Sequence, residues 1–321
     1  MQTPGRFSLD NPDRAKASAA GGDATARLML VLLCCVWGFT WPIMRIALSE
    51  VPPLTMRAMS ALLGALVLFG ICAFKRTDLS IPGVKGWLHV GVASQLNIAA
   101  FSLFSAFAQL GAATSRVAIL AYTMPIWTVV LSVIVLGEKP AGIQQVAIGL
   151  CAAGLAVLIW PLAADGIPRG ILLALATGAS WAAGTVYLKW ARLDADPLAL
   201  ATWQVAIALV VIGSSMLVFE GGPDFRSMHT LGLVTTVLSG VLGTGVAYGL
   251  WFSIIHRLPA VTASLGVLGS PVIGVIASVL LLGERPTVSD IVGFALILAA
   301  SACALLARVG PAVGGKRGVS A

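Results

Sequence analysis

The sequence predicts an all-α integral membrane protein, in which ten transmembrane helices form two inverted repeats of five. Three observations lead to this prediction. The 321 residues are 58% hydrophobic and 10% charged, with a mean hydropathy of +0.96, so there is too little charge to cover a soluble globular protein. Apolar stretches of about 20 residues, enough to cross a bilayer, recur along the chain. The motif LGEKP at 136–140 returns as LGERP at 282–286.

The predicted spans end at segments rich in Pro, Gly or charge, which are typical breaks between helices. In the first half the spans cover 28–48, 54–74, 87–109, 115–136 and 142–160. In the second half they cover 170–190, 198–219, 231–253, 260–282 and 288–307. The breaks include 50–53, 75–78, 137–140, 161–168, 220–223 and 283–286.

The two chain ends differ from these spans in composition. Residues 1–26 are polar, rich in Ala, Gly, Asp and Pro, and carry no core-forming pattern. We therefore expect a disordered cytoplasmic tail over 1–26, a first repeat over 27–160, a second repeat over 168–308, and a short basic cytoplasmic tail over 309–321.

The distribution of Lys and Arg predicts how the chain is oriented. With the N-terminus inside, the outer segments carry only Arg116, Arg169, Arg226 and Arg285. Arg45 and Arg57 lie within the first two spans, and every other Lys and Arg falls on the inner side. Because inner loops of membrane proteins are enriched in basic residues, both termini are predicted to be cytoplasmic.

The two motifs also predict an internal repeat. A shift of 146 residues places Leu136 on Leu282, and the same shift pairs Pro125 with Pro271 and Glu138 with Glu284. Five spans are an odd number, so the second copy would enter the membrane in the opposite direction. Inverted repeats with a site at their interface are an arrangement used by secondary transporters.

Polar and aromatic side chains deep in the spans are the candidates for a substrate cavity, since a polar atom in hydrocarbon needs a partner. They are Trp37, Gln95, Tyr122, Trp181 and Tyr248. For Gln95, a hydrogen bond between helices is an equally good interpretation. Arg45 and Arg57 are predicted near the outer ends of their helices, where they either snorkel to the interface or face the cavity and attract substrate carboxylates.

Two further groups of residues are predicted to shape the helices. Pro42, Pro125 and Pro271 can bend their helices by freeing backbone carbonyls. Glu138 and Glu284 are predicted to be structural residues, which cap helix ends and position tight turns.

Other functions are not favoured by the sequence. The acidic residues lie in tails, loops or helix ends rather than mid-span, which argues against simple carboxylate-coupled antiport. The cysteines and histidines show no metal-ligand spacing, so neither a metal nor another cofactor is expected. The net charge of +7 is scattered over short loops and termini, which indicates membrane orientation rather than nucleic-acid binding.

Several segments, in their order along the chain, carry a resemblance to a known family. They include WGFTWPIMRIA and PPLTMRAMSALLGALVL in the first half, and ASWAAGTVYLKWA and GTGVAYGLWFSIIHRLPA in the second, together with both LGE(K/R)P motifs. The chain resembles EamA-type members of the drug/metabolite transporter superfamily over about residues 27–307. The resemblance implies ten helices, a bacterial inner-membrane location, and transport, often export, of amino acids or other small metabolites.

The leading hypothesis is therefore a secondary transporter that exports a small metabolite, such as an amino acid, across the inner membrane by alternating access. Its partners would be the small-molecule substrate and the lipid bilayer. Three alternatives stay open: an uptake carrier or facilitator, a non-transporting membrane scaffold, and an intramembrane enzyme. An enzyme is not expected, because the spans hold no cluster of nucleophile, base or metal ligands. Substrate, coupling ion and oligomeric state are not predicted.

Overall fold

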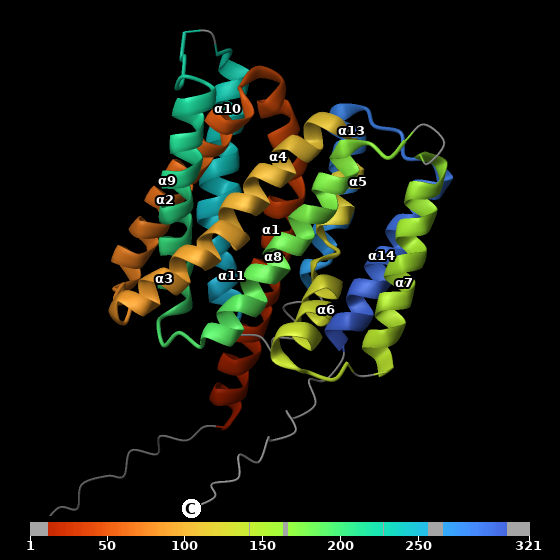
Figure 1. Ribbon diagram of the computed structural model, residues 1–321. Coiled ribbons are helices and arrows are strands. Elements are labelled where there is room, and N and C mark those ends of the chain that lie inside the picture. The colour runs from red at the N-terminus through yellow and green to blue at the C-terminus, as the bar shows by residue number, and fades with distance from the viewer. Residues whose placement is uncertain (1–11, 141, 163–165, 227, 256–265, 307–321) are drawn as a thin grey trace, which may run out of the picture.

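The computed structural model describes residues 12–140, 142–162, 166–226, 228–255 and 266–306. Over these residues the chain forms helices joined by turns, with no strand. The helices pack side by side as a bundle (Figure 1). We call its upper end in Figure 1, where α1 stops at Glu50, the Glu50 end, and the opposite end, where α2 stops at Lys75, the Lys75 end.

The helices of the first half follow one another with short connections. They are α1 (Pro12–Glu50), α2 (Pro53–Lys75), α3 (Gly83–Ser94), the π-helical η1 (Gln95–Ala100), α4 (Phe101–Gly111), α5 (Thr114–Ala121), α6 (Met124–Leu136), α7 (Gly142–Ile159) and the 3₁₀ turn η2 (Trp160–Leu162). The second half consists of α8 (Arg169–Ala191), α9 (Pro197–Phe219), α10 (Thr230–Leu238), the π-helical η3 (Ser239–Val246), α11 (Ala247–Ile255), α13 (Gly269–Leu282) and α14 (Val288–Leu306).

Eight of the described helical segments are long and apolar enough to cross a membrane, the first being Thr25–Glu50 and the last Thr230–Trp251. Two shorter apolar helices, Gly269–Leu282 and Val288–Ala304, follow them. The predicted span 260–282 begins in a segment, 256–265, that lies outside the described residues. The chain can therefore cross a membrane repeatedly.

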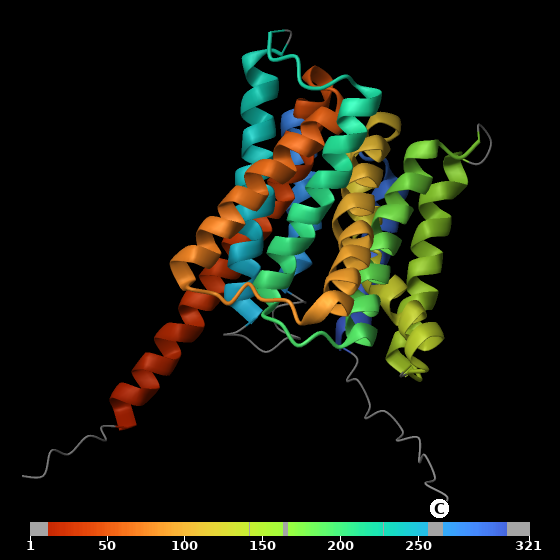
Figure 2. The same cartoon turned by 60° about the vertical axis from the view of Figure 1, so that its left-hand side comes forward.

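The first helix is longer than the sequence predicted. We expected no regular structure over 1–26, but α1 begins at Pro12 and its first turns project from the bundle (Figure 2). Residues 15–26 are rich in alanine, which has the highest intrinsic helix propensity and needs no tertiary partner to favour a helix. The remaining tail segments, 1–11 and 307–321, lie outside the described residues.

Within the described residues, each half contains one π-helical segment inside a stretch that is long and apolar enough to span a membrane. In the first half η1 interrupts the path from α3 to α4, and in the second η3 interrupts the path from α10 to α11. The 146-residue shift of the two motifs moves residues 95–100 onto 241–246, which lie inside η3. Such segments widen the helix locally and are frequent at functional sites.

Packing between the halves follows a pattern. The first helix of each half packs along the fourth span of the other: α1 along α13, and α8 along α5 and α6. Helix α2 packs along α9, and α7 packs along α14 at one side of the bundle (Figure 1). The contact between α1 and α13 is close at Gly38, where a Cβ atom would lie 2.6 Å from Ile273. Only glycine lets these two helices approach so closely.

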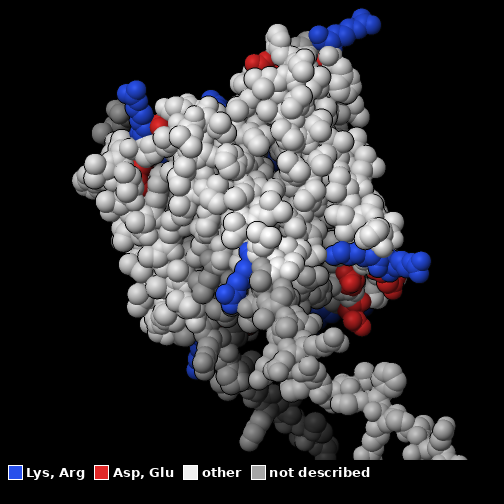
Figure 3. Space-filling model, turned by 180° about the vertical axis from the view of Figure 1, so that it is seen from behind, with Lys and Arg blue, Asp and Glu red and all other residues white. Residues whose placement is uncertain are grey.

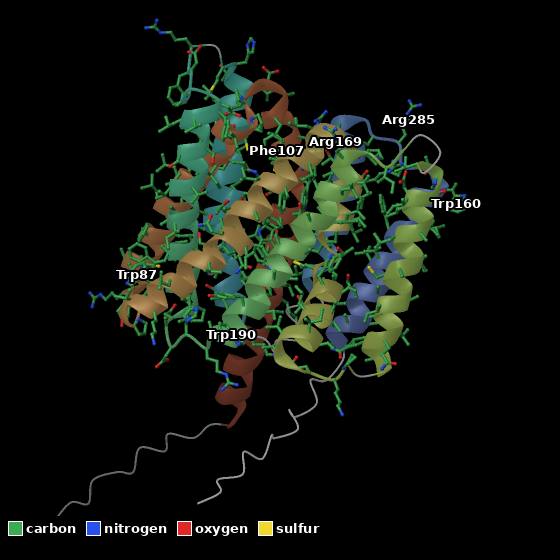
Figure 4. All side chains as sticks on the ribbon, viewed as in Figure 1. Trp87, Phe107, Trp160, Arg169, Trp190 and Arg285 are labelled. Atoms are coloured by element: carbon green, nitrogen blue, oxygen red, sulfur yellow. The ribbon has the colours of Figure 1, made fainter. Side chains whose placement is uncertain are left out.

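Large apolar side chains are exposed on the helices between the two ends, among them Leu66 of α2 and Val210 of α9. On the face in Figure 3, most charged side chains lie toward the two ends of the bundle, with a broad uncharged band between them. Trp160 lies on the same side of the bundle as Arg285, toward the Glu50 end, and Trp190 lies toward the Lys75 end (Figure 4). Aromatic rings at both margins of an apolar band are typical of the two membrane interfaces.

Candidate functional site

A cavity of about 140 Å³ lies inside the bundle. One water molecule occupies about 30 Å³ in the liquid, so the cavity has space for a small molecule. Its walls come from both halves: α1, α2, η1, α4 and α5–α6 of the first, and α8, α9, η3 and α11 of the second. We call it the central cavity.

Aromatic rings form one part of the wall. Trp181 and Tyr248 are stacked, with an interplanar angle of 8° and centroids 6.3 Å apart. Trp37 meets Tyr248 edge-on at 6.4 Å, and Phe101 meets Trp181 at 5.1 Å. The indole Nε1 of Trp37 donates to the carbonyl of Gly243 at 3.3 Å, which fixes the ring. These four residues from four elements enclose an apolar surface suited to an apolar or aromatic group.

Arg57 supplies a positive charge to the same cavity. Its Nη2 donates to the hydroxyl of Ser105, and its Nε is buried without a partner. Among the described residues, no carboxylate oxygen lies within 4.0 Å of its guanidinium. Glu220, at the same end of α2, instead accepts from the backbone amides of Leu54 and Thr55 at 2.9 and 2.7 Å. The guanidinium therefore faces the cavity with most of its donors free.

Small hydroxyl groups complete the polar part of the wall, and the sequence prediction did not include them. The residues are Thr40, Ser60, Ser102, Ser105, Ser239 and Thr244. A serine in a membrane helix usually bonds to a carbonyl of its own helix, as Thr40 does to Val36 at 2.7 Å. Single hydroxyls therefore give little sequence signal. The one usable signal was the pair Ser102 and Ser105, which are three residues apart and so share a helix face.

Four of the five predicted cavity residues line the central cavity: Trp37, Tyr122, Trp181 and Tyr248. Gln95 lies in η1 and is not among the lining residues. The wider turn of a π-helix changes which side chains share a face, and here Ile98 points to the cavity instead. Nearby, the Asn97 amide donates to Gln204 Oε1 at 2.9 Å, the kind of interhelical hydrogen bond considered for Gln95.

The two arginines predicted together are separated in the structure. Arg45 lines a second cavity of about 520 Å³ near the Glu50 end, with Ser49, Gln109 and Glu284. Its Nη1 donates to the backbone carbonyl of Gln109 at 2.5 Å. The Gln109 amide in turn donates to the carbonyl of Trp41, which lines the central cavity, at 3.3 Å. Gln109 thus lies between the two cavities.

The prolines occupy different helical positions. Pro42 lies inside α1. Pro125 and Pro271 lie in the first turns of α6 and α13, where proline's missing N–H costs no hydrogen bond. Pro125 follows a break between α5 and α6 at residues 122–123.

The two predicted turn glutamates have different partners. The carboxylate of Glu284 accepts from the backbone amides of Thr114 and Ser115, at the start of α5, at 2.6 and 2.9 Å. Glu138 accepts from the Lys189 ammonium at 2.6 Å. The 146-residue shift moves Thr114 and Ser115 to 260 and 261, which lie outside the described residues.

Cavity, fold and surface together indicate a multi-pass membrane protein with an internal cavity. The chain belongs to the EamA-like transporter family, whose model matches residues 25–160 and 168–306. Family and relatives indicate a transporter rather than an enzyme.

Three relatives span nearly the same length. The Uncharacterized transporter YoaV of Bacillus subtilis is 25% identical over 84% of this chain and 93% of its own length. The Probable amino-acid metabolite efflux pump of Escherichia coli is 25% identical over 84% and 91%. The Uncharacterized inner membrane transporter YedA of Escherichia coli is 25% identical over 83% and 85%. One solved protein structure superposes with a TM-score of 0.61 at 21% identity, over 88% of this chain and 96% of that chain, and so shares the fold.

Proposed function

We propose that this protein is a secondary transporter of the bacterial inner membrane, which exports a small metabolite such as an amino acid by alternating access. The observation that carries the proposal is the central cavity, whose wall combines helices of both halves. A site at the interface of two halves can be exposed to either side when one half moves against the other. Export is favoured by the relative named as an amino-acid metabolite efflux pump.

Alternating access rests on ten membrane crossings arranged as two inverted five-helix repeats. In support, α6 and α13 end at equivalent glycines, Gly137 and Gly283, with the same backbone angles (φ 67°, ψ 21°). In Figure 1, α6 ends at the Lys75 end and α13 at the Glu50 end, so the equivalent helices run in opposite directions. In this proposal the end of the bundle that carries Lys75 and Lys189 faces the cytoplasm, and both termini lie on that side.

The contacts between halves suggest where the movement occurs. In one set helix α1 packs along α13, and in the other α8 packs along α5 and α6; of these helices, α1, α5, α6 and α8 contribute residues to the wall of the central cavity. Separation of one set and closure of the other would move the opening from one membrane face to the other. None of the described residues that line the central cavity is Asp or Glu. The substrate would therefore move without a carboxylate beside it.

The test compares metabolites released by cells that overproduce the protein with those released by a cavity variant. Trp181→Ala removes a ring from the cavity wall, and Trp160→Ala removes an outward-facing ring that is 82% exposed. Mass spectrometry of the medium should show at least one small metabolite, an amino acid in the leading case, raised by the wild type and by Trp160→Ala but not by Trp181→Ala.

Other outcomes would replace the proposal. A metabolite that is depleted from the medium would indicate an uptake carrier. An unchanged distribution of every metabolite, together with absent flux in proteoliposomes, would contradict transport and favour a membrane scaffold. Chemical conversion of a substrate by the purified protein would indicate an enzyme.

A further inference from the structure

We infer that the central cavity selects small organic carboxylates with an apolar or aromatic body, and that Arg57 is the residue that binds the carboxylate. The inference rests on the proposed transport function for its biological meaning, but binding can be tested without transport.

Arg57 is the only Lys or Arg among the described residues that line the central cavity, and no Asp or Glu is among them. Arg57 is half-buried and its Nε is buried without a partner, and a charge that is removed from water without a counter-ion is costly. An ionisable side chain within a membrane span is therefore a candidate for a functional site. An anionic ligand would supply the missing negative charge.

The free N–H donors of Arg57 indicate which kind of anion it can bind. A guanidinium has five N–H donors in a planar fork, and the hydroxyl of Ser105 accepts from Nη2 alone. Ser105 is held in place because its own hydroxyl donates to the carbonyl of Ser102 at 3.1 Å. The remaining donors suit a planar group that accepts two parallel hydrogen bonds, as a carboxylate does.

The arrangement of the wall indicates the rest of the ligand. Arg57 lies four residues from the start of α2 at the Glu50 end, about 6 Å along the helix axis. Tyr248 lies deeper, 18 residues from the start of the stretch formed by α10, η3 and α11 at the same end. The guanidinium therefore lies toward the Glu50 end and the rings of Trp37, Trp181 and Tyr248 toward the other. A bound carboxylate would direct an apolar body onto these rings.

The experiment measures binding by the full-length protein in lipid nanodiscs, through the fluorescence of its tryptophans, two of which flank Tyr248. The probes are 3-phenylpropionate and its neutral counterpart 3-phenylpropionamide, with 4-methylpentanoate and its amide as an aliphatic pair. We expect the wild type to bind each carboxylate at least about tenfold more tightly than its amide, because a bidentate charged pair replaces two neutral hydrogen bonds.

The variants assign this preference to Arg57. Arg57→Gln should abolish the discrimination between carboxylate and amide. Arg57→Lys should keep part of the preference, since it keeps the charge but loses the planar fork. Arg285→Gln makes the same change of charge at an exposed site outside the cavity (Figure 4) and should behave as the wild type.

Several results would overturn the inference. They are equal affinity of the wild type for carboxylate and amide, no binding of either carboxylate, and a preference that survives Arg57→Gln. If Arg57→Gln does not fold, the affinities of the wild type for each acid and its amide still test whether the cavity prefers a carboxylate. Absence of metabolite flux from cells, with the carboxylate preference intact, would contradict the transport proposal alone.

Discussion

Glu284 and Glu138 occupy the same position in the two LGE(K/R)P motifs, but their environments differ. The Glu284 carboxylate accepts two backbone amides at the start of α5, where the helix dipole favours negative charge. Glu138 forms an ion pair with Lys189, and the two side chains are 30% and 51% exposed. Charge-assisted bonds to unpaired amides contribute more to stability than an exposed ion pair, which is screened by water.

This difference predicts unequal effects of the same substitution. Glu284→Ala should lower the free energy of unfolding by about 1–3 kcal/mol, because two helix N-terminal amides lose their acceptor. Glu138→Ala should change it by less than about 1 kcal/mol. Thermal unfolding of the purified protein in detergent measures both. Equal losses for the two variants would contradict the assigned role of Glu284 as a helix cap.

At the scale of elements, α4 and α8 approach so closely that a glycine is required. A Cβ atom at Gly170 would lie 2.5 Å from the carbonyl carbon of Gly111 and 2.7 Å from the backbone oxygen of Ala108. These are backbone atoms, which cannot move as a flexible side chain can. Small residues at such crossings let membrane helices pack through van der Waals contact.

Gly170→Ala should therefore separate α4 from α8 and lower the melting temperature, since overpacking costs about 1–3 kcal/mol. Gly149→Ala is the matched control: Gly149 is an exposed glycine inside α7 with no atom within 4 Å of the added Cβ. It should leave the melting temperature unchanged or slightly raised, because alanine favours a helix over glycine. A Gly170→Ala protein as stable as the wild type would contradict the close approach.

The helices themselves could be predicted from the sequence better than the side chains that face inward. Apolar length and breaks at Pro, Gly and charged residues placed the helices. Lipid and packed protein both favour apolar side chains, so hydropathy does not separate an outward face from an inward one. Trp181 and Tyr248 could be selected because each carries a polar atom at depth. Gln95 met the same criterion, but it lies in η1, which no hydropathy pattern reveals, and it is not among the residues that line the cavity.

At the scale of the whole molecule, Gln109 of α4 contacts α1 at a point between the two cavities. Gln109 is fully buried. Its side-chain amide donates to the backbone carbonyl of Trp41, and its backbone carbonyl accepts from Arg45. The central cavity therefore lies on one side of this contact and the second cavity on the other. We therefore expect an opening of the central cavity toward the Glu50 end to break the hydrogen bond between Gln109 and Trp41.

Gln109→Ala should therefore shift the protein toward a state that is open at the Glu50 end. Loss of a hydrogen bond of about 1 kcal/mol corresponds to a change of roughly fivefold in the population of that state. The probe is Ser102→Cys, a cavity position, in a background without the native cysteines, labelled in intact cells by a maleimide that does not cross the membrane. Labelling should be several-fold faster with Gln109→Ala and unchanged with Gln145→Ala, an exposed glutamine on α7. An unchanged rate with Gln109→Ala would mean that another contact holds this end closed, because the barrier between the two cavities would then not depend on the Gln109 side chain.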